Sequence, residues 1–201
     1  MITLGLTGSI GMGKSATASM FLEAGVPVYD ADEAVHAIYA KGGSAVEPLR
    51  ARFGDIIVDG AVSRDKLRAI VLSDPSALRD LEAIVHPLVG QSQLAFRETA
   101  AAADEPLMVL DIPLLFETGG DLRCDYTLVV TAPAEVQRAR VLARQGMSED
   151  EFEKILAKQM PDADKRARAD FIVSTAFGFD FARTHVNAII DLLSSMERPS
   201  E

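Results

Sequence analysis

The sequence is poor in cysteine and in aromatic residues. It has one cysteine, Cys124, and no tryptophan, and aromatic residues make up 6% of its 201 positions. A single cysteine excludes a disulfide within the chain and any metal site built from several cysteines. A reducing cytoplasm is therefore the expected location.

Long apolar runs and an excess of positive charge are also missing. No apolar stretch reaches the ~18 residues that a membrane-spanning helix needs. The chain opens on a candidate core strand, so we expect no secretion signal of the basic and then apolar kind. The net charge of −10 leaves no basic face for nucleic acid. We expect neither membrane nor nucleic-acid partners, whereas anionic small substrates stay compatible because they respond to the local field of a cleft.

Glycine is concentrated in one motif near the N-terminus. Residues 8–15 read Gly-Ser-Ile-Gly-Met-Gly-Lys-Ser and fill every fixed position of the phosphate-loop pattern G-x-x-x-x-G-K-S. A candidate buried strand at 2–7 precedes the motif and a candidate helix at 16–24 follows it, which is the context that the pattern requires. The alternative is a glycine-rich turn that only joins strand to helix. We favour a nucleoside triphosphate site, because such glycines let backbone N–H groups surround a phosphate at a helix N-terminus.

The roles within this motif follow from its chemistry. Lys14 can reach the β- and γ-phosphate oxygens, and the Ser15 hydroxyl can hold Mg²⁺. The predicted nucleotide-binding residues are Gly8, Gly11, Met12, Gly13, Lys14, Ser15 and Ala16.

Strands and helices alternate along the rest of the chain. Short runs rich in Val, Leu and Ile predict further strands at 26–29, 107–110, 126–131 and 171–174. Periodicity and capping signals predict helices at 133–145, 148–158 and 181–193. This alternation predicts an α/β fold with an open parallel sheet flanked by helices.

The interval between the second and third strands is too long for a simple crossover. Residues 43–103 show helical signals and no convincing strand pair. A helix should start at Asp74-Pro75 and end or bend near His86, because Pro87 follows, and a second helix should span 88–103. We interpret 43–103 as a helical insertion that binds substrate, and 1–42 with 104–201 as the nucleotide-binding core. A purely structural helical pair is the alternative.

Two aspartates, Asp30 and Asp32, end the second predicted strand. A carboxylate at that edge can accept a hydroxyl proton or orient the hydroxyl toward the γ-phosphorus. Either aspartate could instead cap the helix that begins near Glu33. The two residues could divide these roles.

Arginines provide a second candidate cluster. Arg138, Arg140 and Arg144 lie on the predicted helix at 133–145, where Arg140 and Arg144 share a face. A guanidinium matches the charge that builds on transferred phosphoryl oxygens. A basic stretch follows, which predicts a mobile helical lid at about 145–169 or, alternatively, a solvated surface; its members are Lys154, Lys158, Lys165, Arg166 and Arg168.

In this order the motifs resemble the dephospho-coenzyme A kinase family. The resemblance begins with residues 4–15, continues through 30–32 and 81–89, which include His86-Pro87, and is most specific at 111–117, Asp-Ile-Pro-Leu-Leu-Phe-Glu. Arg140, Arg144 and the segment 169–173 complete it, so it covers nearly the whole chain. One stretch departs from the family pattern, because 174–178 read Ser-Thr-Ala-Phe-Gly where the family usually has Asn. The resemblance therefore assigns no residue of this stretch to the contact with the adenine base.

The resemblance implies a reaction and a fold. ATP with Mg²⁺ would phosphorylate the ribose 3′-hydroxyl of dephospho-coenzyme A, on a phosphate-loop kinase fold whose parallel strands run in the order 2-3-1-4-5. A monomer or weak homo-oligomer is expected. Two rivals are another small-molecule or nucleoside monophosphate kinase and a GTP switch; the switch would need an Asn-Lys-x-Asp segment, which the sequence lacks.

The resemblance also implies roles for individual residues. Lys14, Asp32, Arg140 and Arg144 would be catalytic, with Asp32 as the base. The acceptor would be bound by Thr7, Asp32, Arg64, His86, Pro113 and Leu114. His86 could instead be a helix-end residue without a ligand. Asp111 could be linked to magnesium or could brace the Pro113 turn.

Overall fold

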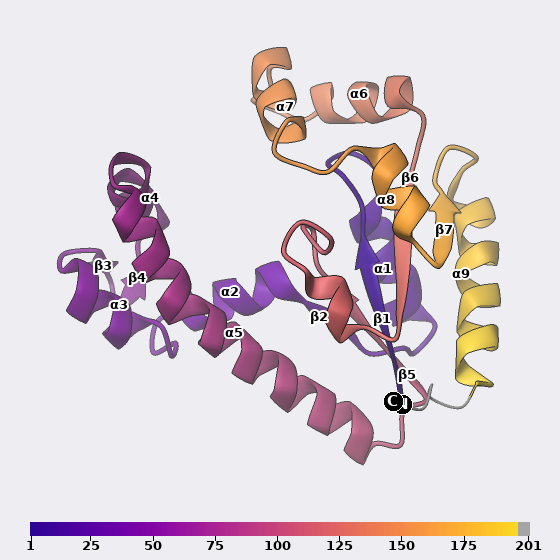
Figure 1. Cartoon of the computed structure of the whole chain (residues 1–201), viewed down its shortest axis with the longest axis horizontal. Helices are drawn as coiled ribbons and strands as arrows, with labels where there is room; N and C mark the ends of the chain where they lie inside the picture. Colours follow the sequence, from indigo (N-terminus) through magenta and orange to yellow (C-terminus); the bar gives the residue numbers. More distant parts are fainter. Residues whose placement is uncertain (197–201) are drawn as a thin grey trace. The chain divides into compact units, whose positions relative to one another are not determined.

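Five strands form one sheet in the computed structural model, which describes residues 1–196 (Figure 1). Their order in the sheet is β2-β5-β1-β6-β7, so in order along the chain these strands are arranged 2-3-1-4-5, as the family resemblance implied. The β5, β1, β6 and β7 neighbours pair in parallel. The bounds are β1 Ile2–Thr7, β2 Val28–Asp30, β5 Leu107–Asp111, β6 Tyr126–Thr131 and β7 Phe171–Ser174.

The chain divides into two compact units. The first joins Met1–Tyr29 to the part of the chain that begins at Ala100, and the second is Asp30–Thr99. The helix that follows β2 therefore lies in the second unit, whereas the sequence predicts that residues 1–42 belong to the core. None of the helices within residues 1–196 is both long and apolar enough to cross a bilayer.

Helices flank the sheet of the first unit (Figure 1). In its core, apolar side chains of the strands pack against buried helix residues such as Phe21 of α1 and Val186 of α9. This packing is possible on both sides of the sheet because buried strands carry apolar side chains on both faces. The helices are α1 Lys14–Glu23, the short 3₁₀ helix η1 Gly120–Arg123, α6 Ala134–Leu142, α7 Glu149–Leu156, α8 Asp162–Arg168 and α9 Phe179–Ser194.

One helix of this unit is shorter than expected. The sequence predicted a helix from Pro133 to about Gln145, but α6 ends at Leu142. The chain turns there, since the Arg144 amide donates to the Val141 carbonyl and Gly146 adopts φ 80°. Arg144 therefore lies in a turn after α6 and not on the same helix as Arg140.

The second unit has its own apolar core, around buried residues such as Ile38, Leu49 and Val85. It contains mainly helices and one small hairpin. Its elements are α2 Ala31–Tyr39, α3 Val46–Phe53, β3 Ile57–Val58, β4 Ala61–Val62, α4 Arg64–Ser73 and most of α5 Pro75–Ala102.

Two expectations for this region are wrong. α5 is a single helix of 28 residues with Pro87 inside it, so the helix does not end near His86 and 88–103 is not a separate helix. A proline removes one amide donor and need not end a helix whose flanking turns pack against a core. The antiparallel pair β3–β4 was also missed. It is joined by Asp59 and Gly60, with φ 52° and 85°, and Asp-Gly is a strong two-residue hairpin signal.

Candidate active site

The phosphate loop lies between the end of β1 and the start of α1, as the motif required. Its glycines allow close approach to neighbouring segments. A Cβ at Gly8 would lie 2.8 Å from the Val130 carbonyl oxygen, and one at Gly11 would lie 2.5 Å from Val141 Cγ2 and 2.9 Å from the Gln137 carbonyl oxygen. Gly11 and Gly13 also have φ of 78° and 95°, a region that other residues rarely adopt. The loop is thus held tightly against β6 and α6.

Backbone donors of the loop are open to a ligand. In the described part of the chain, no group accepts a hydrogen bond from the amides of Gly11, Gly13, Lys14, Ser15 or Ala16. Three of these amides belong to the first turn of α1, where N–H groups have no partner within the helix. Met12 differs, because its amide donates to the Ser9 carbonyl at 3.1 Å. This arrangement can bind an anion, and the partial positive charge of the helix N-terminus favours it.

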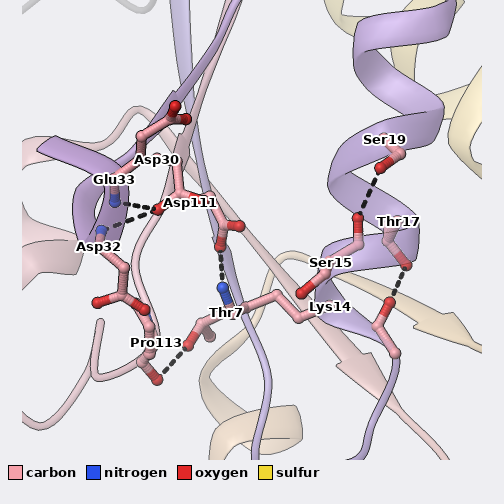
Figure 2. A network of polar contacts seen from close by, with 11 residues as sticks. Thr7, Lys14, Ser15, Thr17, Ser19, Asp30, Asp32, Glu33, Asp111 and Pro113 are labelled. Atoms are coloured by element: carbon pink, nitrogen blue, oxygen red, sulfur yellow. Dashed lines mark hydrogen bonds and ion pairs between the residues drawn. The ribbon is translucent and has the colours of Figure 1, made fainter. Parts of the chain in front are cut away.

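Lys14 forms an ion pair with Asp111 (Figure 2). Its Nζ lies 2.5 Å from Asp111 Oδ1, and the Asp111 side chain is 3% exposed. Asp111 is the last residue of β5, next to β1, so the parallel sheet brings its carboxylate to the loop. The structure thus assigns Asp111 a contact that the sequence did not predict: it holds the ammonium group beside the open amides.

Ser15 is exposed at the first turn of α1. Its backbone carbonyl accepts a hydrogen bond from Ser19, but its hydroxyl makes none with the described residues. A free hydroxyl oxygen is a suitable ligand for Mg²⁺, which prefers oxygen donors and usually keeps several waters. Residues 1–196 hold no cluster of three or more His, Cys, Asp or Glu side chains that could bind a metal by themselves.

A pocket of about 260 Å³ adjoins the loop in the first unit. Gly11, Gly13, Ala16, Arg140 and Arg144 are among its lining residues, so this pocket brings together predicted residues from the loop, from α6 and from the turn after it. Arg140 and Arg144 lie together here although α6 ends before Arg144. A cavity of this kind beside an anion site can take the rest of a nucleotide.

Thr175 connects Arg140 to the phosphate loop. The Arg140 guanidinium donates to Thr175 Oγ1 at 2.7 Å and to the Thr175 carbonyl at 2.8 Å, and the Thr175 hydroxyl donates to the Met12 carbonyl at 2.8 Å. Thr175 and Phe179, which is 70% exposed, also line the pocket. Neither residue was singled out on sequence. For Thr175 the available signal is that 174–178 departs from the family pattern, whereas Phe179 lies outside that stretch and has no such signal.

The segment after β5 forms a turn braced by β1. The Thr7 hydroxyl donates to the Pro113 carbonyl at 3.0 Å, so two residues predicted to bind the acceptor contact each other (Figure 2). Thr7 is fully buried, whereas Leu114 is 38% exposed. Thr7 therefore supports the turn, and Leu114 is the member of this group that a ligand can reach.

Asp30 and Asp32 differ in their hydrogen bonds. Asp30 is the N-cap of α2, where its Oδ1 accepts from the Asp32 amide at 2.8 Å and from the Glu33 amide at 3.0 Å (Figure 2). The Asp32 carboxylate is exposed and accepts no hydrogen bond from the described residues. The capping function thus belongs to Asp30, which leaves the Asp32 side chain available to a ligand.

Arg64 and His86 both lie in the second unit. Arg64 begins α4, and its guanidinium carbon is 5.8 Å from the centre of the Tyr39 ring. Burial raises the pKa of Tyr39, and the positive charge of Arg64 opposes part of that rise. His86 is exposed on α5, one residue before Pro87, and its imidazole has no hydrogen bond within the described residues. It is a mid-helix residue, so the helix-end alternative does not apply.

The basic stretch predicted as a lid is not uniformly solvated. Lys165 on α8 is fully buried, and its Nζ lies 2.9 Å from Glu117 Oε1. Glu117 also accepts from the Met160 amide at 2.8 Å. Burial raises the pKa of Glu117, but the Lys165 ammonium and the Met160 amide outweigh it, so its pKa lies below the usual value. α8 is therefore anchored to the 111–117 segment, and sequence periodicity gave no sign of this buried pair.

Comparisons with known proteins agree on one family. A family model described as dephospho-CoA kinase matches residues 2–178. A dephospho-CoA kinase from Mesorhizobium japonicum is 59% identical over 193 residues, covering 96% of this chain and 97% of that protein. One from Rhodopseudomonas palustris is 51% identical over 198 residues, covering 98% of each.

Solved structures share the fold. A Thermus thermophilus protein matches with a TM-score of 0.80 at 36% identity, covering 98% of both chains. The dephospho-CoA kinase from Campylobacter jejuni matches with a TM-score of 0.64 at 22% identity, covering 96% of this chain and 98% of that one, which supports the fold alone. By its family model and its curated relatives, the chain belongs to the dephospho-CoA kinase family.

Proposed function

We propose that the chain transfers the γ-phosphoryl group of ATP to the ribose 3′-hydroxyl of dephospho-CoA and releases CoA and ADP. Family membership supports the reaction, which is the final step of CoA biosynthesis. The observation that carries the proposal is the loop with five open backbone amides, next to Lys14 and to a pocket that can hold the rest of the nucleotide.

Lys14 and Arg140 would act on the charge of the transferred group. The Lys14 ammonium is held beside the open amides by Asp111, so it is in position to meet the β- and γ-phosphate oxygens. Arg140 keeps its fork beside the loop through Thr175, and Arg144 adds a second guanidinium to the same pocket. Fixed donors of this kind stabilise charge that develops in the transition state.

Asp32 would receive or orient the acceptor hydroxyl. Its carboxylate is exposed and uncommitted, whereas Asp30 is used as a cap. A carboxylate within reach of the 3′-hydroxyl can take its proton as the oxygen approaches phosphorus. Arg64 and His86 would contact the acceptor from α4 and α5 of the second unit. Leu114, from the turn after β5, would be a further acceptor-binding residue. Within the predicted lid of about 145–169, the part before Gln159 would close over the nucleotide, because Met160 and Lys165 are held by Glu117.

Mg²⁺ fits the donor set of the loop. Ser15 offers a free hydroxyl, and the absence of a preformed carboxylate cluster in residues 1–196 suits an ion that is held largely by nucleotide phosphates and water. When bound, the ion would neutralise charge on the β- and γ-phosphate oxygens. The remaining expectations, a cytoplasmic location and a monomer or weak homo-oligomer, are part of the same proposal.

An acceptor assay tests this function directly. The chain is incubated with ATP, Mg²⁺ and dephospho-CoA, ADP is followed by a coupled reaction, and phosphorus NMR locates the new phosphate ester. We expect ADP formation that requires dephospho-CoA and an ester on the ribose 3′-oxygen. If dephospho-CoA is inert while another alcohol or a nucleoside monophosphate is consumed, the acceptor is wrong.

A further inference from the structure

The Ile10 backbone is held by two glutamine side chains from distant parts of the first unit. Gln159 Oε1 accepts a hydrogen bond from the Ile10 amide at 3.0 Å. On the other side of the same residue, Gln137 Nε2 donates to the Ile10 carbonyl at 2.8 Å. Gln137 lies on α6 and is 4% exposed, whereas Gln159 lies in the linker between α7 and α8 and is half-buried. Both peptide groups that flank Ile10 are therefore fixed by side chains.

Other backbone groups of the loop are restrained by other means. The Met12 amide bonds to the Ser9 carbonyl, and the Met12 carbonyl accepts from Thr175. Ile10 is thus the loop residue whose amide depends on a side chain from the predicted lid segment. Gln159 fixes the Ser9–Ile10 peptide, whereas the Ile10–Gly11 peptide, which carries the open Gly11 amide, is fixed by Gln137 through the Ile10 carbonyl. Because the loop binds phosphate through the directions of its amides, rotation of the Ser9–Ile10 peptide would change the backbone path that leads into the Gly11 donor.

The linker that carries Gln159 is itself anchored. Met160, the next residue, donates its amide to Glu117 Oε1 at 2.8 Å, and the same carboxylate pairs with the buried Lys165 of α8. Gln159 therefore projects from a fixed segment and does not have to be ordered when a ligand arrives. A pre-ordered partner restrains the loop at a lower entropic cost than a mobile one.

We propose that Gln159 is a positioning residue for triphosphate binding: by accepting from the Ile10 amide, it holds the phosphate loop in the shape that leaves the amides of Gly11 and Gly13–Ala16 open. This inference rests on the proposed function in that it assigns the loop to the ATP phosphates. Gln159 touches the loop and not the reacting atoms. Its effect belongs to the phosphate end of the nucleotide, not to the base or the acceptor.

The test compares Gln159→Met with wild type in the full-length chain. Methionine keeps the length of the side chain but removes the acceptor oxygen. We expect the dissociation constant of inorganic tripolyphosphate, measured by calorimetry with Mg²⁺, to rise about threefold to tenfold, the range of one hydrogen bond. Adenosine binding should stay unchanged. In the kinase assay, KM for ATP should rise while KM for dephospho-CoA does not.

Gln91→Met is the matched control, because Gln91 is exposed on α5 and its side chain has no hydrogen bond within residues 1–196. It should bind both probes as wild type does. The inference is overturned if Gln159→Met binds tripolyphosphate as well as or better than wild type, or if adenosine binding weakens equally, which would indicate general loosening. The two proposals fail separately: a wild-type chain that binds tripolyphosphate but leaves dephospho-CoA unphosphorylated refutes the reaction and not the role of Gln159.

Discussion

The two compact units present their predicted functional residues in opposite ways. In the first, the phosphate loop is restrained through its backbone by Gln137, Gln159 and Thr175, and Lys14 is paired with Asp111. In the second, Asp32 and His86 are exposed side chains without a hydrogen bond among the described residues. The proposed nucleotide site thus depends on a fixed backbone shape, whereas the residues proposed for the acceptor depend on side-chain hydrogen bonds that only a ligand would complete.

The largest effect should come from the charged side chain in the restrained region. Lys14→Ala removes the ammonium group beside the open amides, and we expect kcat to fall about 10³-fold, because this group would stabilise charge on the transferred phosphoryl oxygens. Steady-state kinetics with ATP and dephospho-CoA measure it. Lys41→Ala, which changes an exposed lysine outside the proposed site, is the control. A kcat of Lys14→Ala close to that of wild type would contradict the proposed role of the phosphate loop in phosphoryl transfer.

A change in the second unit should separate catalysis from nucleotide binding. Asp32→Asn removes the base but preserves the shape of the side chain, and kcat should fall about 10²-fold or more. The dissociation constant for ATP should stay close to the wild-type value. Glu33→Gln, a neighbouring exposed change on α2, should behave like wild type. A large loss of ATP binding in Asp32→Asn would instead give Asp32 a metal-binding or structural role.

A substitution of Arg140 tests whether the activity requires the two-donor geometry of its guanidinium or only its positive charge. Arg140→Lys keeps the positive charge but cannot make the two-donor contact with Thr175 Oγ1 and the Thr175 carbonyl. We expect kcat/KM for ATP to fall about 10- to 100-fold, as for the loss of a hydrogen bond from a charged group. Arg138→Lys, which changes an exposed arginine on the same helix, is the control. Equal kinetics for both variants would show that charge alone suffices.

The smallest effect concerns stability and its dependence on pH. The folded-state pKa of Glu117 is depressed below the ordinary value of 4.5, so its pairing with Lys165 and Met160 stabilises the fold above that pH and is lost as pH falls through the folded pKa. Glu117→Gln should lower Tm by about 5 °C at pH 7. The difference should shrink as the pH drops below 4.5, as thermal scans from pH 3 to 7 would show. Glu153→Gln on α7 is the control. A difference in Tm between Glu117→Gln and wild type that does not change with pH would contradict the stabilising role given to the Glu117 carboxylate.

The parts of the molecule predicted correctly from sequence are those encoded in short contiguous segments. The phosphate loop and its flanking strand and helix occupy neighbouring positions. The helix predicted to begin at 148 is capped by the Ser148 hydroxyl, which accepts a hydrogen bond from the Glu151 amide three residues later. The five-stranded order was implied by the family resemblance and agrees with the structure. Local signals succeed here because the interactions that fix these elements are themselves local.

Contacts between distant positions could not be predicted in this way. Thr175 and Gln159 reach loop residues that lie 163 and 149 positions earlier in the sequence, and the pair Lys165–Glu117 was hidden in a run of charges that is typical of a solvated helix. The β3–β4 hairpin is a different case. Its Asp-Gly signal was present, but strands of two residues are too short to show alternation. The turn at Arg144 likewise follows from local backbone bonds that helix propensity does not contain.

Gly11 sets the spacing between the phosphate loop and α6. Its missing side chain is what lets Val141 and the Gln137 carbonyl approach so closely, and α6 also carries Arg140. Any larger residue at this position would displace the helix or the loop, so the guanidinium and the open amides would move apart together. The absence of a side chain at Gly11 therefore keeps Arg140 and the open amides, the two parts of the proposed phosphate site, at a fixed spacing. A substitution at Gly11 should be harder to compensate than a substitution in either part alone.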